Sequence, residues 1–133
     1  MSADVAYLDT SAVVKLVMRE RETASLRREL RRWPRRASST LLRVELLRAI
    51  KRGGVQRLVA PAQRHLAAIT LIRMDETLLD RAGDLDPASS RSLDAIHLAA
   101  ALTLGSDLGI VVTYDDRMLQ GAAALGLPTA TPH

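Results

Sequence analysis

Four acidic side chains of this 133-residue chain stand at positions from which they could share one site. Asp9 and Asp115 each follow a short apolar segment of the kind that forms a buried strand. Asp94 lies in the first turn of an apolar segment that we expect to be a helix, and Glu45 lies beside the apolar stripe of another helix. Because the loops after parallel strands meet at one edge of a sheet, these carboxylates can converge there.

Clustered carboxylates need a compensating cation. Two carboxylates about 4 Å apart repel by roughly 4 kcal/mol at an effective dielectric constant of about 20. No lysine follows Lys51 in the chain, so none stands beside the later acids to neutralise them. A divalent metal is the natural cation, and ligation by oxygen alone suits Mg²⁺ or Mn²⁺ better than zinc. Such a metal polarises a phosphoryl oxygen and lowers the pKa of a bound water, which is the chemistry of phosphodiester hydrolysis.

Charge is distributed unevenly along the chain. Residues 1–74 hold 16 Lys and Arg against 6 Asp and Glu, a net charge of +10, whereas residues 75–133 hold 3 against 9, a net charge of −6. A basic surface beside an acidic site suits an enzyme that cuts a polyanion. The alternative is a solvated helix face without a ligand.

Composition limits the classes of protein that fit. The length and the 47% hydrophobic content predict one domain over residues 1–133. The absence of cysteine excludes disulfides, thiolate zinc sites and a cysteine nucleophile. No apolar segment reaches the roughly 18 residues of a membrane helix, so we expect a cytoplasmic protein without membrane contact. Aromatic residues are only 2% of the chain, so base stacking could not dominate the binding of any nucleic acid.

The pattern of apolar residues predicts alternating strands and helices, hence a parallel sheet covered on both faces. We expect Thr10 or Ser11 to cap the first helix and Arg36 to Ser38 to form an edge strand, because the preceding link is basic. The predicted strands are residues 5–8, 69–74 and 110–113, with an extended tail at 127–131. The predicted helices are residues 10–18, 20–33, 38–52, 61–67, 75–82, 92–104 and 118–125.

Four motifs in order along the chain resemble those of a PIN domain, specifically the VapC toxin of a toxin–antitoxin pair. They are residues 7–12 (YLDTSA), Ser39 followed six residues later by Glu45, residues 92–99 (SLDAIHLA) and residues 113–115 (TYD). The resemblance covers essentially the whole chain. It implies an α/β fold, a PIN-like three-layer sandwich in which a short parallel sheet has helices on both faces.

The same resemblance implies a Mg²⁺-dependent endoribonuclease, with Mn²⁺ as the other candidate ion. It assigns the catalytic and metal-binding acids to Asp9, Glu45 (through water), Asp94 and Asp115, with Asp116 as the less favoured alternative to Asp115. Thr10, Ser11 and Thr113 are the supporting hydroxyls, and Arg27, Arg28, Arg31 and Arg32 are the candidates for contacts to RNA or antitoxin. A homodimer that is inhibited by a cognate VapB-like antitoxin is also implied.

Other functions are open at this point. The chain could be a PIN-like nuclease of RNA processing without an antitoxin, or a PIN-like module that only binds a partner. A metal-independent ribonuclease would have to use His65, His97 or His133, yet a lone histidine in an apolar helix is more often packed or hydrogen-bonded. A phosphorylatable receiver-like domain would need an early acid pair and a lysine on the last strand, and the sequence has neither.

Overall fold

A five-stranded parallel sheet in the order β3-β2-β1-β4-β5 forms the middle of the molecule. The computed structural model describes residues 3–133. The strands are β1 (Val5–Leu8), β2 (Arg35–Ser39), β3 (Thr70–Ile72), β4 (Leu108–Val112) and β5 (Thr129–Ala130). The helices are α1 (Thr10–Val17), α2 (Thr23–Leu30), α3 (Leu41–Gly53), α4 (Val59–Ala67), α5 (Glu76–Asp84), α6 (Ser92–Thr103) and α7 (Asp116–Ala124), with short 3₁₀ turns at Gln56–Leu58 and Gly105–Asp107.

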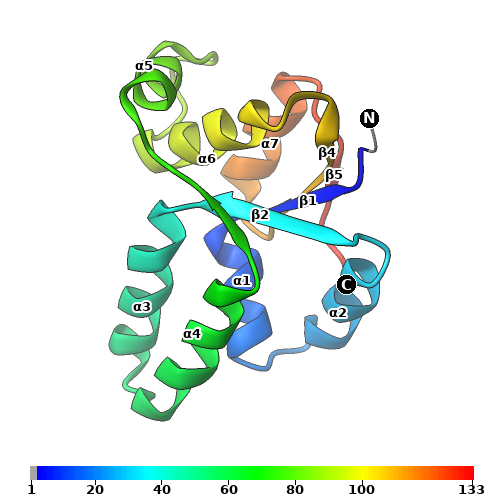
Figure 1. Cartoon of the computed structure of the whole chain (residues 1–133), viewed down its shortest axis with the longest axis vertical. Helices are drawn as coiled ribbons and strands as arrows, with labels where there is room; N and C mark the ends of the chain where they lie inside the picture. Colours follow the sequence, from blue (N-terminus) through cyan, green and yellow to red (C-terminus); the bar gives the residue numbers. More distant parts are fainter. Residues whose placement is uncertain (1–2) are drawn as a thin grey trace.

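Helices cover both faces of this sheet, which confirms the predicted three-layer sandwich (Figure 1). Helices α1 to α4 lie on one side and α5 to α7 on the other. Each side has its own apolar core, because successive side chains of a strand point to opposite faces. Ala6 and Leu8 of β1 join the core on the α1–α4 side, whereas Tyr7 joins the core beneath α6 and α7.

The central strand and the loop that follows it are buried. All four residues of β1 are buried, and they pair with β2 on one side and with β4 on the other. Helix α1 begins directly after Asp9, whose side chain accepts a hydrogen bond from the backbone N–H of Ala12. The cap of α1 is therefore Asp9, and the expectation that Thr10 or Ser11 would cap it was wrong.

Strand β2 lies between β1 and β3, so the expectation of an edge strand was wrong. Only its first residues are basic, and they stand at the exposed beginning of the strand. There the guanidinium of Arg35 pairs with the carboxylate of Asp4 at 2.5 Å. The second half of the strand, Ala37 to Ser39, is buried and small enough to pack between its neighbours.

Most other predicted elements are present, with shifted ends. Helix α3 begins at Leu41 because Ser39 still belongs to β2, and it ends at Gly53, before the cap residue Gly54, which takes a left-handed conformation with φ of 67°. Strand β3 is only three residues long, and α7 begins at Asp116 rather than at Met118. The extended tail forms β5, which pairs with β4. Within residues 3–133, no helix is long and apolar enough to cross a membrane.

Candidate active site

The fold brings the four predicted acids to the region where the parallel strands end. Asp9 follows β1 and Asp115 follows β4, and these two strands are neighbours in the sheet. Asp94 lies in the first turn of α6. Glu45 lies in the second turn of α3, the helix that follows β2.

Asp9 is held by hydrogen bonds to both carboxylate oxygens. Its Oδ1 accepts from the hydroxyl of Ser11 at 2.6 Å and from the backbone N–H of Ala12 at 3.1 Å. Its Oδ2 accepts from the buried hydroxyl of Thr113 at 2.5 Å. Burial raises the pKa of Asp9 above its usual range, and these hydrogen bonds oppose that rise only in part.

The two hydroxyls that bind Asp9 also hold the loop between β4 and α7. The hydroxyl oxygen of Ser11 accepts from the backbone N–H of Tyr114 at 2.8 Å. The hydroxyl oxygen of Thr113 accepts from the backbone N–H of Asp115 at 3.0 Å. Ser11 and Thr113 therefore support the site, because they fix the backbone of Asp115 relative to the carboxylate of Asp9.

Glu45 is held by a second network, which reaches across the sheet to β1. Its Oε1 lies 2.5 Å from the hydroxyl of Thr10 and 2.8 Å from Nε2 of His97. Nδ1 of His97 lies 2.7 Å from the hydroxyl of Tyr7. Burial raises the pKa of Glu45, but the hydrogen bonds from His97 and Thr10 outweigh it and leave the pKa below its usual value.

The chemistry of the partners fixes the direction of these bonds. An ionised carboxylate can only accept, so Nε2 of His97 carries the hydrogen and Nδ1 is the acceptor. Burial raises the pKa of Tyr7 well above its usual value, so its hydroxyl stays protonated and donates a hydrogen bond to Nδ1. His97 is thus the buried, hydrogen-bonded histidine that its apolar helix predicts, and it orients Glu45.

Asp94 and Asp115 are the open part of the site. Asp94 is half-buried, and no described residue pairs with its carboxylate. Burial raises the pKa of Asp94, and the negative charge of Asp115 raises it further. Asp115 caps α7 by accepting from the N–H groups of Arg117 and Met118 through Oδ1 alone, and its side chain is exposed.

The donors fit a hard divalent cation, but the site is not a closed cage. Within the described chain, no three His, Cys, Asp or Glu side chains stand close enough together to hold one ion. Mg²⁺ does not require such a cage, because it keeps several waters and is usually bound by one or two carboxylates plus substrate phosphates. The unpaired carboxylate of Asp94 beside the charge of Asp115 is the kind of donor set that such an ion uses.

The other predicted residues lie elsewhere. Asp116 is the first residue of α7, and it is Asp115 whose charge acts on Asp94. Arg31 and Arg32 follow α2 and lead into the beginning of β2, whereas Asp9 follows the end of the neighbouring parallel strand β1, so they lie at opposite ends of the strands. The candidate arginines of α2 and its end therefore do not border the acidic site directly.

Only one of the three histidines contacts the acids. His65 lies on α4, where burial and then the charges of Arg27, Arg36 and Arg64 lower its pKa. The ring of His133 packs edge-on against Tyr114 at 6.3 Å between centroids. The link between His97 and Glu45, 52 residues apart, was missed from sequence, although the spacing of three residues from Asp94 put His97 near the same end of α6.

Comparisons with known proteins identify the family of the chain. The family model for the PIN domain matches residues 6–124. The chain is 49% identical over 126 residues to "Ribonuclease VapC46" of Mycobacterium tuberculosis, a match that covers 95% of this chain and 96% of that protein. It is also 41% identical over 130 residues to "Ribonuclease VapC47" and 40% identical over 134 residues to "Ribonuclease VapC35" of the same organism, with the same coverage. The chain therefore belongs to the PIN domain family, among the relatives that carry the name VapC.

Proposed function

We propose that this protein is a Mg²⁺-dependent endoribonuclease that acts as the toxin of a type II toxin–antitoxin pair. The names of its relatives support ribonuclease activity on RNA. The observation that carries the metal dependence is the pair of carboxylates of Asp94 and Asp115. The charge of Asp115 raises the pKa of Asp94, and no described cationic side chain pairs with either carboxylate.

In this proposal Asp94 and Asp115 would hold the ion together with waters, and Asp9 and Glu45 would contact it through water, because no three described acids stand close enough together to bind one ion directly. A bound Mg²⁺ supplies a water of lowered pKa and stabilises negative charge on the phosphoryl oxygens. The chain's own groups have separate tasks. Thr113 and Ser11 keep the Asp9 carboxylate turned toward the loop of Asp115.

Glu45 has the task of positioning water and accepting a proton. Its Oε1 is engaged by Thr10 and His97, and no described residue binds its Oε2. The lowered pKa keeps Glu45 ionised, so Oε2 can accept a hydrogen bond from a water molecule at neutral pH. A base within hydrogen-bond reach of the attacking water is what hydrolysis requires.

The partners follow from the same proposal. The substrate is RNA, and Arg27, Arg28, Arg31 and Arg32 remain candidates for contacts to its phosphates or to a VapB-like antitoxin. These arginines lie on α2 and just after it, before the beginning of β2, whereas Asp9 follows the end of the parallel strand β1. They would therefore bind a flanking part of the RNA rather than the cleaved bond. A homodimer and a cytoplasmic location stay predictions.

Cleavage of total RNA with and without a chelator tests the function. We expect cleavage in Mg²⁺, none in EDTA, and fragments with 5′-phosphate and 3′-hydroxyl ends, because water rather than the ribose 2′-hydroxyl attacks. Fragments with 2′,3′-cyclic phosphate ends, or full activity in EDTA, would contradict the proposal. Binding of RNA without any cleavage would instead support a non-catalytic PIN-like module.

Co-expression with a candidate VapB-like antitoxin tests the toxin role separately. A toxin should halt growth when expressed alone, and its antitoxin should restore growth and form a complex with it. Metal-dependent cleavage without such a partner would support a nuclease of RNA processing.

A further inference from the structure

A small pocket opens beside Asp94, between the loop 85–91, the start of α6 and the helix α7. Its volume is about 200 Å³. The side chains that matter for its chemistry are those of Ser89, Ser90, Arg91, Asp94, Arg117 and Gln120. One of the four candidate catalytic acids thus forms part of the pocket wall.

The pocket contains most of the arginines of the acidic part of the chain, residues 75–133. Residues 75–133 contain only three basic side chains, Arg81, Arg91 and Arg117. Two of them, Arg91 and Arg117, line this pocket, whereas Arg81 lies on α5 at another surface. The side chains of Arg91 and Arg117 are exposed and have no ion-pair or hydrogen-bond partner among residues 3–133. The two guanidinium groups outnumber the one carboxylate of the pocket, that of Asp94, on which the charge of Arg91 acts, so the pocket as a whole favours an anionic ligand.

The size and the lining restrict that ligand further. Pockets for drug-sized ligands usually measure about 300 to 1,000 Å³, so this pocket is too small for a whole nucleotide. It has no aromatic side chain on which a base could stack, whereas Ser89, Ser90 and Gln120 can donate hydrogen bonds. These features fit a phosphate group with the edge of its ribose.

We propose that Arg91 and Arg117 bind a phosphate of the RNA strand that flanks the phosphodiester at the candidate active site. The inference rests on the proposed nuclease function and adds to it the residues that hold the substrate backbone. Because Asp94 borders both places, a strand held by the two arginines passes the acid that is central to the candidate site. Contacts to a phosphate position a strand without reading its sequence.

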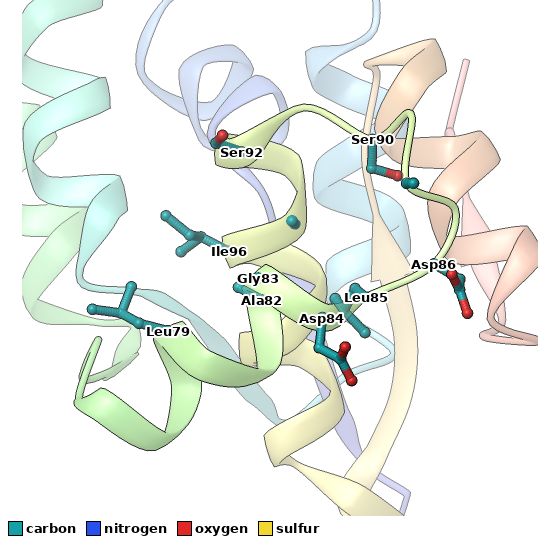
Figure 2. A pocket seen from close by; sticks show the side chains of 11 residues that line it. Leu79, Ala82, Gly83, Asp84, Leu85, Asp86, Ser90, Ser92 and Ile96 are labelled. Carbon is teal, nitrogen blue, oxygen red and sulfur yellow. The ribbon is translucent and has the colours of Figure 1, made fainter.

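A larger cavity next to this pocket lacks the chemistry for the same ligand. It measures about 530 Å³ and lies between α5, α6 and the loop that joins them (Figure 2). Its charged lining residues are Asp84 and Asp86, and no arginine or lysine lines it. Its walls otherwise include apolar groups such as Leu79 and Ile96. A phosphate would be repelled there, so size alone does not identify the RNA site.

Binding of RNA that cannot be cleaved tests the inference. The probe is a fluorescently labelled, single-stranded 2′-O-methyl RNA in EDTA, which resists attack by both a metal-activated water and a 2′-hydroxyl. Fluorescence anisotropy over a series of salt concentrations gives the affinity and its salt dependence. The variants are Arg91→Gln, Arg117→Gln and the double variant, and Arg81→Gln is the matched control because it removes the same charge from the same acidic region.

The double substitution should lower the slope of log affinity against log salt by about 0.7, and each single substitution by less, because the two arginines neutralise one phosphate and its loss means that fewer counterions are released when RNA binds. The double variant should bind roughly tenfold more weakly at low salt. Arg81→Gln should leave both quantities unchanged. Melting temperatures should stay at the wild-type value, because the two side chains are exposed and unpaired.

If either pocket variant folds poorly, Arg91→Lys and Arg117→Lys take its place and should keep the wild-type salt slope. Pocket variants that match Arg81→Gln would overturn the inference. So would variants that bind RNA normally but lose an antitoxin, since the pocket would then receive a protein partner. If the variants weaken RNA binding but the wild-type protein cleaves no RNA in Mg²⁺, the phosphate site stands and the proposed nuclease function fails.

Discussion

The candidate site has a closed part and an open part, although both consist of carboxylates. In the closed part, both carboxylate oxygens of Asp9 and Oε1 of Glu45 accept hydrogen bonds from hydroxyl, backbone and imidazole donors. In the open part, the carboxylate of Asp94 has no partner among the described residues, and Asp115 binds only its own helix start through one oxygen. The fold therefore binds the first pair of acids through direct hydrogen bonds, whereas Arg91 acts on Asp94 only through its charge, which does not offset burial and the charge of Asp115.

This difference separates two ways in which a fold can hold negative charge. Hydrogen-bond donors fix the orientation of Asp9 and Glu45 before any ligand binds, which lowers the cost of reorganisation during a reaction. The repulsion between Asp94 and Asp115 destabilises the folded protein, and a bound cation would remove this repulsion. Substitutions in the two parts should consequently affect activity and stability in different proportions.

Asp94→Asn should have the largest effect on activity. Loss of a charged ligand should lower the cleavage rate by about a thousandfold, which corresponds to about 4 kcal/mol of transition-state stabilisation. In EDTA the variant should be as stable as the wild type or slightly more stable, because the substitution relieves repulsion by Asp115. A cleavage assay and a melting curve, each on both proteins, measure the two effects.

One interaction acts against this gain in stability. The charge of Asp94 stabilises the N-terminus of α6 by about 0.3 to 1 kcal/mol, and asparagine loses part of that stabilisation. Asp80→Asn, at an exposed position of α5, is the control for removing a charge from the same acidic region. It should change neither activity nor stability appreciably. An Asp94→Asn protein that cleaves RNA at the wild-type rate would remove Asp94 from the site.

Thr113→Val should chiefly affect the closed part. The buried hydroxyl of Thr113 donates to Asp9 and accepts from the backbone N–H of Asp115. Its removal leaves both groups short of a partner, so the free energy of unfolding should fall by about 1 to 3 kcal/mol. Urea denaturation of the variant and the wild type measures this loss.

Thr103→Val serves as the matched control. The hydroxyl of Thr103 donates only to the carbonyl of Ala99 one turn earlier in α6, and the residue is exposed. Its replacement should change the free energy of unfolding by less than about 0.5 kcal/mol. Equal losses of unfolding free energy for the two variants would mean that the hydrogen bonds of Thr113 to Asp9 and Asp115 do not stabilise the closed part more than an ordinary surface hydroxyl does.

The individual acids of the site should also differ in how pH affects stability in EDTA, and the difference does not follow the division into two parts. The raised pKa values of Asp9 and Asp94 mean that these groups favour the folded state below their unfolded pKa of 3.8, and that this contribution is lost as pH rises through their folded pKa. The lowered pKa of Glu45 has the opposite sign, because its contribution is present above 4.5 and is lost as pH falls through the folded pKa.

The melting temperature in EDTA should therefore rise on acidification from neutral pH and fall again once Glu45 takes up its proton. Asp94→Asn should show a smaller rise, whereas saturating Mg²⁺ should reverse the trend near neutral pH, because the ion binds ionised carboxylates. A melting temperature that declines steadily from pH 7 downwards in EDTA would contradict the assigned pKa directions.

The sequence predicts where Asp9 and Thr113 lie, but not the contact between Glu45 and His97. Asp9 and Thr113 follow apolar strands directly, and strand order places them side by side, so local pattern was sufficient. The cap of α1 was assigned one residue too late because Thr10 and Asp9 both have capping side chains. The central position of β2 was missed because its basic residues are confined to the exposed end of the strand.

The pocket beside Asp94 depends on tertiary structure that no local pattern encodes. Arg91 and Arg117 are 26 positions apart, and they meet only because the loop 85–91 runs past α7. The arginine-rich segment of the sequence instead lies on α2 and just before β2, away from the ends of the strands where the acids lie. Charge counts identify which half of a chain is basic, but the few cations of an acidic half can be the ones that lie beside the site.

Melting of the wild type and of Asp94→Asn, each in EDTA and in saturating Mg²⁺, tests the central claim most directly. If the open carboxylates form the cation site, Mg²⁺ at about 100 times its Kd should stabilise the wild-type protein by about 2.7 kcal/mol. The same Mg²⁺ should stabilise Asp94→Asn far less. An equal shift in both proteins, or no shift in the wild type, would contradict the account, because the ion would then bind elsewhere or not at all.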